Sequence, residues 1–215
     1  RLTPKNYEQL RSLLGELIIR NRRATSDVKF TKRYAKTIRI QLSEKEKALY
    51  ESVSDMVKNQ YKGSPQQVKM ALRILQEEIG SIPPAAVSTL ESLKEKLPDS
   101  AQIARLIEQC KLLTFSEKVK VLIDVIHKTP DKVIVFTKFR ASHTAIATAL
   151  KKHGIRYSHL HGGLTRHEKE KSIKDFQNTS KALVSTDVGS EGRNLQFCNH
   201  IIGAFLLGFR NEGQQ

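Results

Sequence analysis

Apolar residues at helical spacing characterise the first half of the chain. Near the start they recur every three or four positions, which predicts an amphipathic helix. These positions are Leu10, Leu13, Leu14, Leu17 and Ile18. We expect this stripe to pack in a core or against another lobe, and a groove for a partner helix is the alternative interpretation.

Further helices are predicted as far as residue 111. Residues 34–42 alternate polar and apolar positions imperfectly and predict a strand. Turn-forming residues at 63–65 and 83–84 divide the stretch from 43 to 111 into short helices. Three pairs along the chain have capping-box spacing, which marks the first turn of a helix. They are Ser43 with Glu46, Thr114 with Glu117, and Thr165 with Glu168.

The pattern changes in the second half, where short β-branched runs alternate with helical stretches. The predicted strands are 133–136, 155–160, 182–184 and a fourth that begins at 200. This alternation predicts a parallel sheet with right-handed crossovers and helices on both faces. Ligands of such sheets bind at the carboxyl ends of the strands.

Three loops leave those carboxyl ends, at residues 137–140, 161–165 and 185–194. They contain glycines, hydroxyls and basic side chains. Glycine lets a phosphate approach the main chain, and N–H groups at a helix start can hold an anion. Glycine in a single loop also serves turns, so it is the order of the three loops that indicates a phosphate-binding edge.

The loops carry a family resemblance. Val133–Arg140, Leu160–Phe176 and Ala182–Ile202 resemble successive motifs of the second RecA-like lobe of superfamily-two helicases and translocases. Thr186–Gln196 is particularly similar to the Swi/Snf-type family, above all its bacterial RapA-like branch, through the arrangement Ser-Glu-Gly-x-Asn-Leu-Gln. Residues 10–23 and 38–53 also resemble family segments, so the resemblance covers nearly the whole chain.

The resemblance implies roles for single residues. Those that would lie along a nucleic-acid backbone are Thr137, Lys138, Arg140, His161, Gly162, Thr186 and Gly189. Those that would face a nucleotide cleft between two lobes are Glu191, Gly192 and Asn194. In the family, ATP bridges the two lobes, and its hydrolysis releases them to give a translocation step.

Two features of the family are missing from the sequence. It contains no Gly-x-x-x-x-Gly-Lys-Ser/Thr loop and no Asp-Glu pair, which cradle nucleotide phosphates and Mg²⁺. We therefore expect no catalytic residue here, ATP and Mg²⁺ bound mainly by another lobe, and no hydrolysis by this chain alone. After Ile202 the family's Gln-x-x-Gly-Arg-x-x-Arg motif is replaced by Gly203–Arg210. Either residues are missing at this junction or the tail is unrelated, so Arg210 is not assigned as an arginine finger.

The net charge of the chain indicates which class of binding partner to expect. The chain has 37 Lys and Arg against 22 Asp and Glu, a net charge of +15, which suits a polyanion; a solvated basic surface is the alternative. Residues 20–39 alone carry a charge of +7, where DNA contact and solvation are equally good interpretations. No apolar run approaches the roughly 20 residues of a membrane helix. We expect a protein without a membrane partner, in the cytoplasm with the nucleoid of a prokaryote or in the nucleus of a eukaryote.

A metal site is not predicted. Four histidines fall between residues 153 and 167, and His159 and His161 would share one strand face, which raises the question of zinc. No cysteine lies nearby, and neither Cys110 nor Cys198 has metal-ligand or disulfide spacing. The loop motif explains His161 better. Because the chain opens at Arg1 without Met, we expect it to be a piece of a longer protein.

These patterns predict an α/β fold, a RecA-like parallel sheet preceded by a mainly helical region. We expect a connector from the first lobe over 1–42, a helical insertion over 43–111 and the second RecA-like lobe over 112–215. The expected function is that of the C-terminal motor lobe of an ATP-dependent translocase. Its partners would be double-stranded DNA, the first lobe and a protein complex to be remodelled. The alternatives are an RNA helicase lobe, which normally lacks the insertion, and a non-catalytic basic nucleic-acid-binding module.

Overall fold

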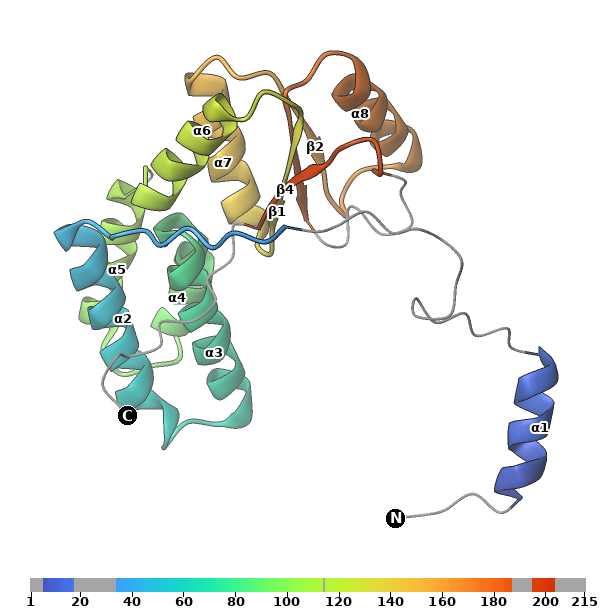
Figure 1. The fold of residues 1–215 in the computed structure, drawn as a ribbon. Coiled ribbons are helices and arrows are strands. Elements are labelled where there is room, and N and C mark those ends of the chain that lie inside the picture. Colours follow the sequence, from blue (N-terminus) through green and yellow to red (C-terminus); the bar gives the residue numbers. More distant parts are fainter. Residues whose placement is uncertain (1–5, 18–33, 114, 187–194, 204–215) are drawn as a thin grey trace. The chain divides into compact units, whose positions relative to one another are not determined.

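The computed structural model describes residues 6–17, 34–113, 115–186 and 195–203 (Figure 1). The chain divides into two compact units, Arg1–Ile38 and Arg39–Gln215. In the first unit, helix α1 (Tyr7–Leu17) confirms the helix predicted there, and Ile18 lies outside the described residues. Four large apolar side chains of α1 are exposed, namely Tyr7, Leu10, Leu13 and Leu14.

The strand predicted over residues 34–42 is wrong. These residues form no hydrogen-bonded secondary structure, although their sequence alternates. A strand is stabilised by the ladder it forms with a neighbour. No strand in the described part of the chain pairs with this segment, so the alternation alone does not produce one.

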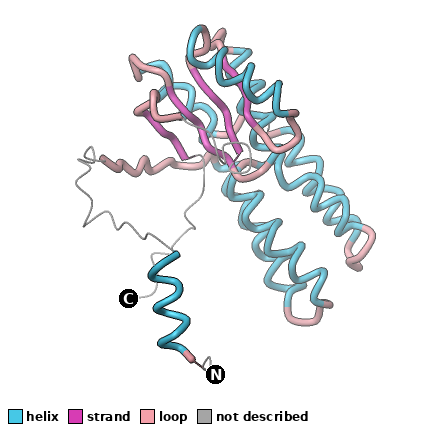
Figure 2. Tube along the Cα trace, turned by 90° about the vertical axis from the view of Figure 1, so that its right-hand side faces the viewer, coloured by secondary structure: helices cyan, strands magenta, loops and turns pink. Residues whose placement is uncertain are grey.

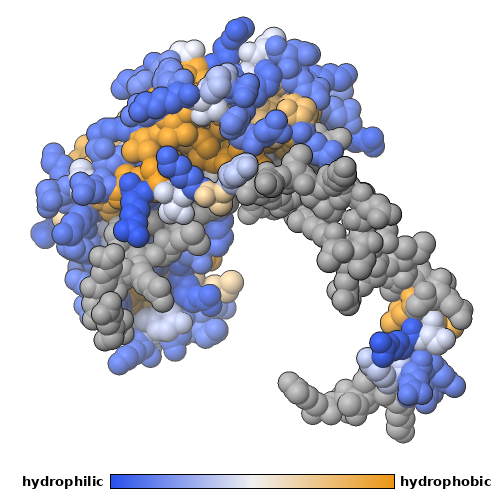
Figure 3. All heavy atoms as spheres, in the orientation of Figure 1, coloured by the Kyte–Doolittle hydropathy of each residue, from blue (hydrophilic) through white to orange (hydrophobic). Residues whose placement is uncertain are grey.

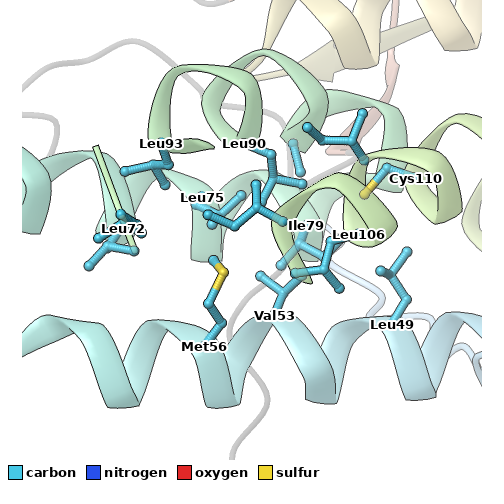
Figure 4. Packing of buried hydrophobic residues seen from close by; sticks show 14 of the residues in the cluster. Leu49, Val53, Met56, Leu72, Leu75, Ile79, Leu90, Leu93, Leu106 and Cys110 are labelled. Atoms are coloured by element: carbon cyan, nitrogen blue, oxygen red, sulfur yellow. The ribbon is translucent and has the colours of Figure 1, made fainter. Parts of the chain in front are cut away.

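Helices then make up the first part of the second unit. They are α2 (Glu44–Tyr61), α3 (Gln66–Ser81), the 3₁₀ turn η2 (Pro83–Ala86), α4 (Val87–Lys94) and α5 (Ser100–Leu112). We call this the helical region. Ser43 and Glu46 form the predicted capping box at the start of α2. The helices enclose an apolar core in which Val53 and Met56 of α2 face Leu75 of α3 and Leu106 of α5 (Figure 4).

A parallel sheet comes next, and it confirms the predicted α/β fold. Its elements are α6 (Glu117–Lys128), β1 (Val133–Thr137), α7 (Arg140–Lys152), β2 (Tyr157–Leu160), α8 (Arg166–Asn178), β3 (Ala182–Thr186) and β4 (His200–Gly203). We call this part the sheet lobe. The strands lie in the order β2-β3-β1-β4, side by side in Figure 2, and every pair is parallel. Thr165 and Glu168 form the predicted capping box of α8.

Helices cover both faces of the sheet, as predicted (Figure 1). Successive strand residues point to opposite faces. Val133 and Val135 therefore pack with α6 and α7, whereas Ile134 packs with Phe176 of α8. The edge strand β4 is mostly exposed, and Ile201 is 64% exposed. Figure 3 shows an apolar area in its upper left part, over the sheet lobe.

The helical region and the sheet lobe share a buried carboxylate. One oxygen of Glu46 accepts hydrogen bonds from the backbone N–H and hydroxyl of Ser43, and the other accepts one from the N–H of Glu117 at 2.9 Å. One side chain thus caps α2 and α6 together. Beside it, Lys118 donates to the carbonyl of Gly80, and burial lowers the pKa of Lys118 to about 8.

The cap predicted for α6 is wrong. The N-cap is Ser116, whose hydroxyl accepts from the N–H of Val119. Thr114, the predicted cap, lies outside the described residues. Among the described helices, none is long and apolar enough to span a lipid bilayer.

Candidate nucleic-acid interface

The carboxyl ends of β1, β2 and β3 bring the predicted loops to one edge of the sheet. Thr137 at the end of β1 lies opposite Thr186 at the end of β3, and Leu160 at the end of β2 lies opposite Ser185. We call this the carboxyl edge. The predicted residues Gly189, Glu191, Gly192 and Asn194 lie outside the described residues.

The start of α7 offers main-chain N–H donors at this edge that have no side-chain cap among the described residues. Its N-cap, Phe139, has an extended backbone and provides no side-chain cap. The first N–H groups of an uncapped helix are oriented along the axis and suit an anion. Arg140 is the first residue of α7 and is exposed. Among the described residues no carboxylate pairs with its guanidinium, so backbone donors and a cation face outward together.

Arg140 also reaches the loop after β2. A Cβ atom added at Gly163 would lie 3.2 Å from Nη1 of Arg140 and 3.3 Å from Nδ1 of His161. An alanine here would require the ends of these two side chains to move by a few tenths of an ångström. The predicted residues Arg140 and His161 thus lie close together at Gly163, which the motif assignment did not include. Its place beside Gly162 was the available signal.

His161 is held as a neutral ring. Its Nδ1 accepts a hydrogen bond from the N–H of Gly163 at 3.2 Å, which leaves the proton on Nε2. Partial burial and the positive charge of Arg140 lower the pKa of His161. The ring can therefore donate a hydrogen bond without adding charge.

His143 is a second residue that the sequence did not single out. It is a buried residue of α7, and its Nε2 lies 3.2 Å from the carbonyl oxygen of Val184 in β3. Burial, and then the nearby His161, lower the pKa of His143 to about 4. Its ring centroid lies 5.3 Å from that of His161 and 6.2 Å from that of His159. Within the described ranges, no group of three potential ligands could hold a metal ion.

The remaining predicted residues differ in exposure. Thr137 is fully buried, and its hydroxyl has no hydrogen-bond partner in the described part of the chain. Thr186 is partly exposed. Lys138 is exposed and forms an ion pair with Glu77 of α3; its ammonium lies 5.6 Å from the ring centroid of Phe139. The surface of the edge is therefore formed by Lys138, Arg140, His161 and the glycines, with Thr137 beneath it.

Comparisons with known proteins agree with this arrangement. The model of the helicase conserved C-terminal domain matches residues 117–206. The uncharacterized ATP-dependent helicase YqhH of Bacillus subtilis is 33% identical over 202 residues, which cover 91% of this chain and 36% of YqhH. The chain thus spans about a third of that relative.

Two further relatives match shorter stretches. The DEAD-box ATP-dependent RNA helicase 35A of Oryza sativa is 31% identical over 97 residues, 45% of this chain and 16% of its own length. The RNA polymerase-associated protein RapA of Vibrio campbellii is 27% identical over 143 residues, 64% of this chain and 14% of RapA.

Solved structures show the same fold. The Pyrococcus furiosus Hef helicase domain superposes with a TM-score of 0.63 at 17% identity, covering 94% of this chain and 57% of that one. The C-terminal domain of the Sulfolobus solfataricus SWI2/SNF2 ATPase gives 0.50 at 19% identity, covering 77% and 68%. By family match, relatives and fold, the chain contains the conserved C-terminal domain of helicases over residues 117–206, folded as a RecA-like lobe that resembles the C-terminal domain of a Swi2/Snf2 ATPase.

Proposed function

We propose that the chain is the C-terminal motor lobe of an ATP-dependent, double-stranded-DNA translocase that remodels protein–nucleic-acid complexes. The observation that carries this proposal is the carboxyl edge, where the uncapped start of α7 and the guanidinium of Arg140, without a carboxylate partner among the described residues, face a glycine-containing loop. Donors of this kind bind phosphates of any base sequence. A translocase needs such contacts because it must move along its track.

The helical region supports this proposal over an RNA helicase, because the family resemblance implies that an RNA helicase lobe normally lacks such an insertion. The match with YqhH covers 91% of this chain and so includes most of the helical region. The match with the rice RNA helicase covers 45% of the chain. An RNA helicase lobe would share the sheet and its loops, which is the part that a shorter match can contain.

Each donor at the carboxyl edge has a distinct task in this proposal. The N–H groups at the start of α7 and the guanidinium of Arg140 would hold one phosphate, and Lys138 a neighbouring one. The neutral His161 would donate from Nε2. Gly162 and Gly163 carry no side chain, so the strand can approach the main chain. Thr186 and Gly189 are proposed for the tracked strand, and Thr137 for supporting the loop from below.

ATP and Mg²⁺ are proposed to bind mainly to a first lobe. Nucleotide phosphates are cradled by glycine-rich loops with a lysine, and no such motif occurs in this sequence. Glu191, Gly192 and Asn194 are proposed to complete the nucleotide cleft from this side. ATP would supply the energy for closing and opening the lobes, and the carboxyl edge would hold the strand between steps.

The test is ATP turnover by the full-length gene product with and without duplex DNA or RNA, beside this chain alone. Stimulation by duplex DNA with no turnover by the chain alone is expected. Stimulation by RNA only would replace the proposal with an RNA helicase. No turnover under any condition would leave a basic nucleic-acid-binding module. The proposed function implies that the protein is located in the nucleus of a eukaryote or with the nucleoid of a prokaryote.

A binding experiment separates the nucleic-acid contacts from the ATPase. Lys138→Ala and Thr186→Ala should weaken binding to all duplex sequences alike. Lys138→Ala should also reduce the salt dependence, because a cation bound to phosphate releases counterions. The measurement is fluorescence anisotropy with two duplexes of unrelated sequence over a series of salt concentrations. A loss confined to one sequence would contradict tracking along the backbone.

A further inference from the structure

One cation of the carboxyl edge is already occupied by another part of the protein. The ammonium of Lys138 pairs with the carboxylate of Glu77, which lies 61 positions earlier in α3. Both side chains remain about half exposed, at 55% and 48%. The carboxylate therefore stands at the surface where a phosphate would have to approach Lys138.

The position of Glu77 is fixed by contacts at the end of α3. The hydroxyl of Ser81, one helical turn after Glu77, lies 2.9 Å from that of Ser142 in α7. The carbonyl of Gly80 accepts a hydrogen bond from Lys118 in α6. These bonds join the end of α3 to α6 and α7 of the sheet lobe. Glu77 is thus part of a docked helix end, which keeps its carboxylate near the loop after β1.

We propose that Glu77 competes with nucleic-acid phosphate for Lys138, so that the helical region lowers the affinity of the carboxyl edge. The inference rests on the proposed function of that edge. A phosphate that binds Lys138 has to displace a carboxylate of the same sign of charge. Any motion that draws α3 away from the loop frees the ammonium, and any motion that docks it restores the competition.

The expected size of the effect depends on the exposure of the pair. Half-exposed ion pairs contribute little, so releasing Lys138 should raise the affinity for duplex DNA by about two- to fivefold at low salt. Salt screens exposed charges, so the gain should shrink as the salt concentration rises. Glu77→Gln removes the charge and leaves the helix propensity almost unchanged.

The experiment measures the affinity of the full chain for a duplex DNA oligonucleotide by fluorescence anisotropy at low salt. Glu77→Gln is compared with Glu91→Gln, a matched control that makes the same change of charge. Glu91 is a half-exposed carboxylate of α4 that pairs with Lys111 of α5 at 3.5 Å. Both substitutions are also made in a Lys138→Ala background, and circular dichroism verifies that each variant is folded.

Tighter binding by Glu77→Gln than by Glu91→Gln, lost in the Lys138→Ala background, is the expected result. A gain that persists without Lys138 would overturn the proposal, because it would come from net charge alone. Weaker binding by Glu77→Gln would overturn it too, since Glu77 would then position Lys138 for the ligand. Arg140→Ala distinguishes a failure of the proposed competition from a failure of the proposed function. If Arg140→Ala weakens binding and Glu77→Gln changes nothing, only the competition fails; if neither Arg140→Ala nor Lys138→Ala weakens binding, the proposed function fails with it.

Discussion

The two ends of the sheet are both rich in cations, but they use them differently. At the amino end, Lys132 donates to the carbonyl of Ser180 at 2.9 Å, and Lys181 donates to those of Thr129 at 2.5 Å and Pro130 at 2.7 Å. These ammonium groups satisfy main-chain acceptors where strands begin. At the carboxyl edge, Arg140 has no carboxylate partner among the described residues, and Lys138 pairs with a side chain of another region.

The difference shows that a count of charges does not locate a binding surface. The amino end even has an open depression of about 610 Å³, lined in part by Lys132, Arg156 and Lys181. Two of these three cations are engaged by carbonyls, so their donors stabilise the fold. Donors that face outward next to an uncapped helix mark the edge where a ligand is expected. Substitutions at the two ends should therefore separate stability from binding.

The largest expected effect concerns His143 at the carboxyl edge and depends on pH. Its pKa is about 4 in the folded protein and 6.5 in the unfolded chain, so only the unfolded chain takes up the proton between these values. Stability contributed by the neutral ring is present above pH 6.5 and is lost as the pH falls toward 4. The loss is on the order of 3 kcal/mol.

Chemical denaturation at several pH values measures this loss. His143→Gln, whose amide can still donate to the carbonyl of Val184, should remove that part of the pH dependence. His167→Gln, at an exposed position of α8, serves as the control and should leave it unchanged. If His143→Gln and the wild type lose stability in parallel below pH 6.5, the histidine is not buried as a neutral ring.

The next effect is on binding. Arg140→Ala should lower the affinity for duplex DNA on the order of tenfold, because a charge-assisted hydrogen bond contributes about 1.5–3 kcal/mol. The free energy of unfolding should change little, since Arg140 is exposed. Arg156→Ala at the amino end removes the same charge and should weaken binding less. Equal losses from both variants would break the distinction between the two ends.

The converse effect is expected for Lys181. Lys181→Met keeps the apolar stem but leaves the carbonyls of Thr129 and Pro130 without their partner, which should cost about 1–2 kcal/mol of stability. Thermal denaturation measures this cost. Affinity for DNA should fall no more than for Arg156→Ala. A stable Lys181→Met variant with a large loss of affinity would move the binding surface to the amino end.

The smallest effect is expected for Gly163→Ala. The new methyl group would meet the ends of the Arg140 and His161 side chains, which are able to move by a few tenths of an ångström. We expect about a twofold loss of affinity and a change of stability below about 0.5 kcal/mol. Gly63→Ala is the control, because a Cβ there would meet no atom within 4 Å. A loss as large as that of Arg140→Ala would mean that the glycine itself contacts the ligand.

Local features of the fold could be predicted from the sequence, whereas features that depend on distant partners could not. The capping boxes at Ser43 and Thr165 need only residues three positions apart, and both are confirmed. The box expected at Thr114 is wrong because Ser116 caps α6 and Glu46, 71 positions away, binds the N–H of Glu117. No local pattern contains that partner.

The same limit applies to the candidate site. The order of loops could be predicted because parallel strands bring their ends together, and motif resemblance supplied Lys138, Arg140 and His161. The contribution of His143 depends on how α7 packs on β3, and the pairing of Lys138 with Glu77 depends on how α3 docks. Both arise from tertiary packing, which a linear pattern does not encode.

The shared carboxylate of Glu46 bears on how this protein can be divided. A shortened chain that began at the sheet lobe would keep every strand, yet the N–H of Glu117 would lose its acceptor and Lys118 its carbonyl at Gly80. A piece that keeps both contacts therefore starts before residue 43. A sheet lobe without the helical region would need other acceptors for these two donors.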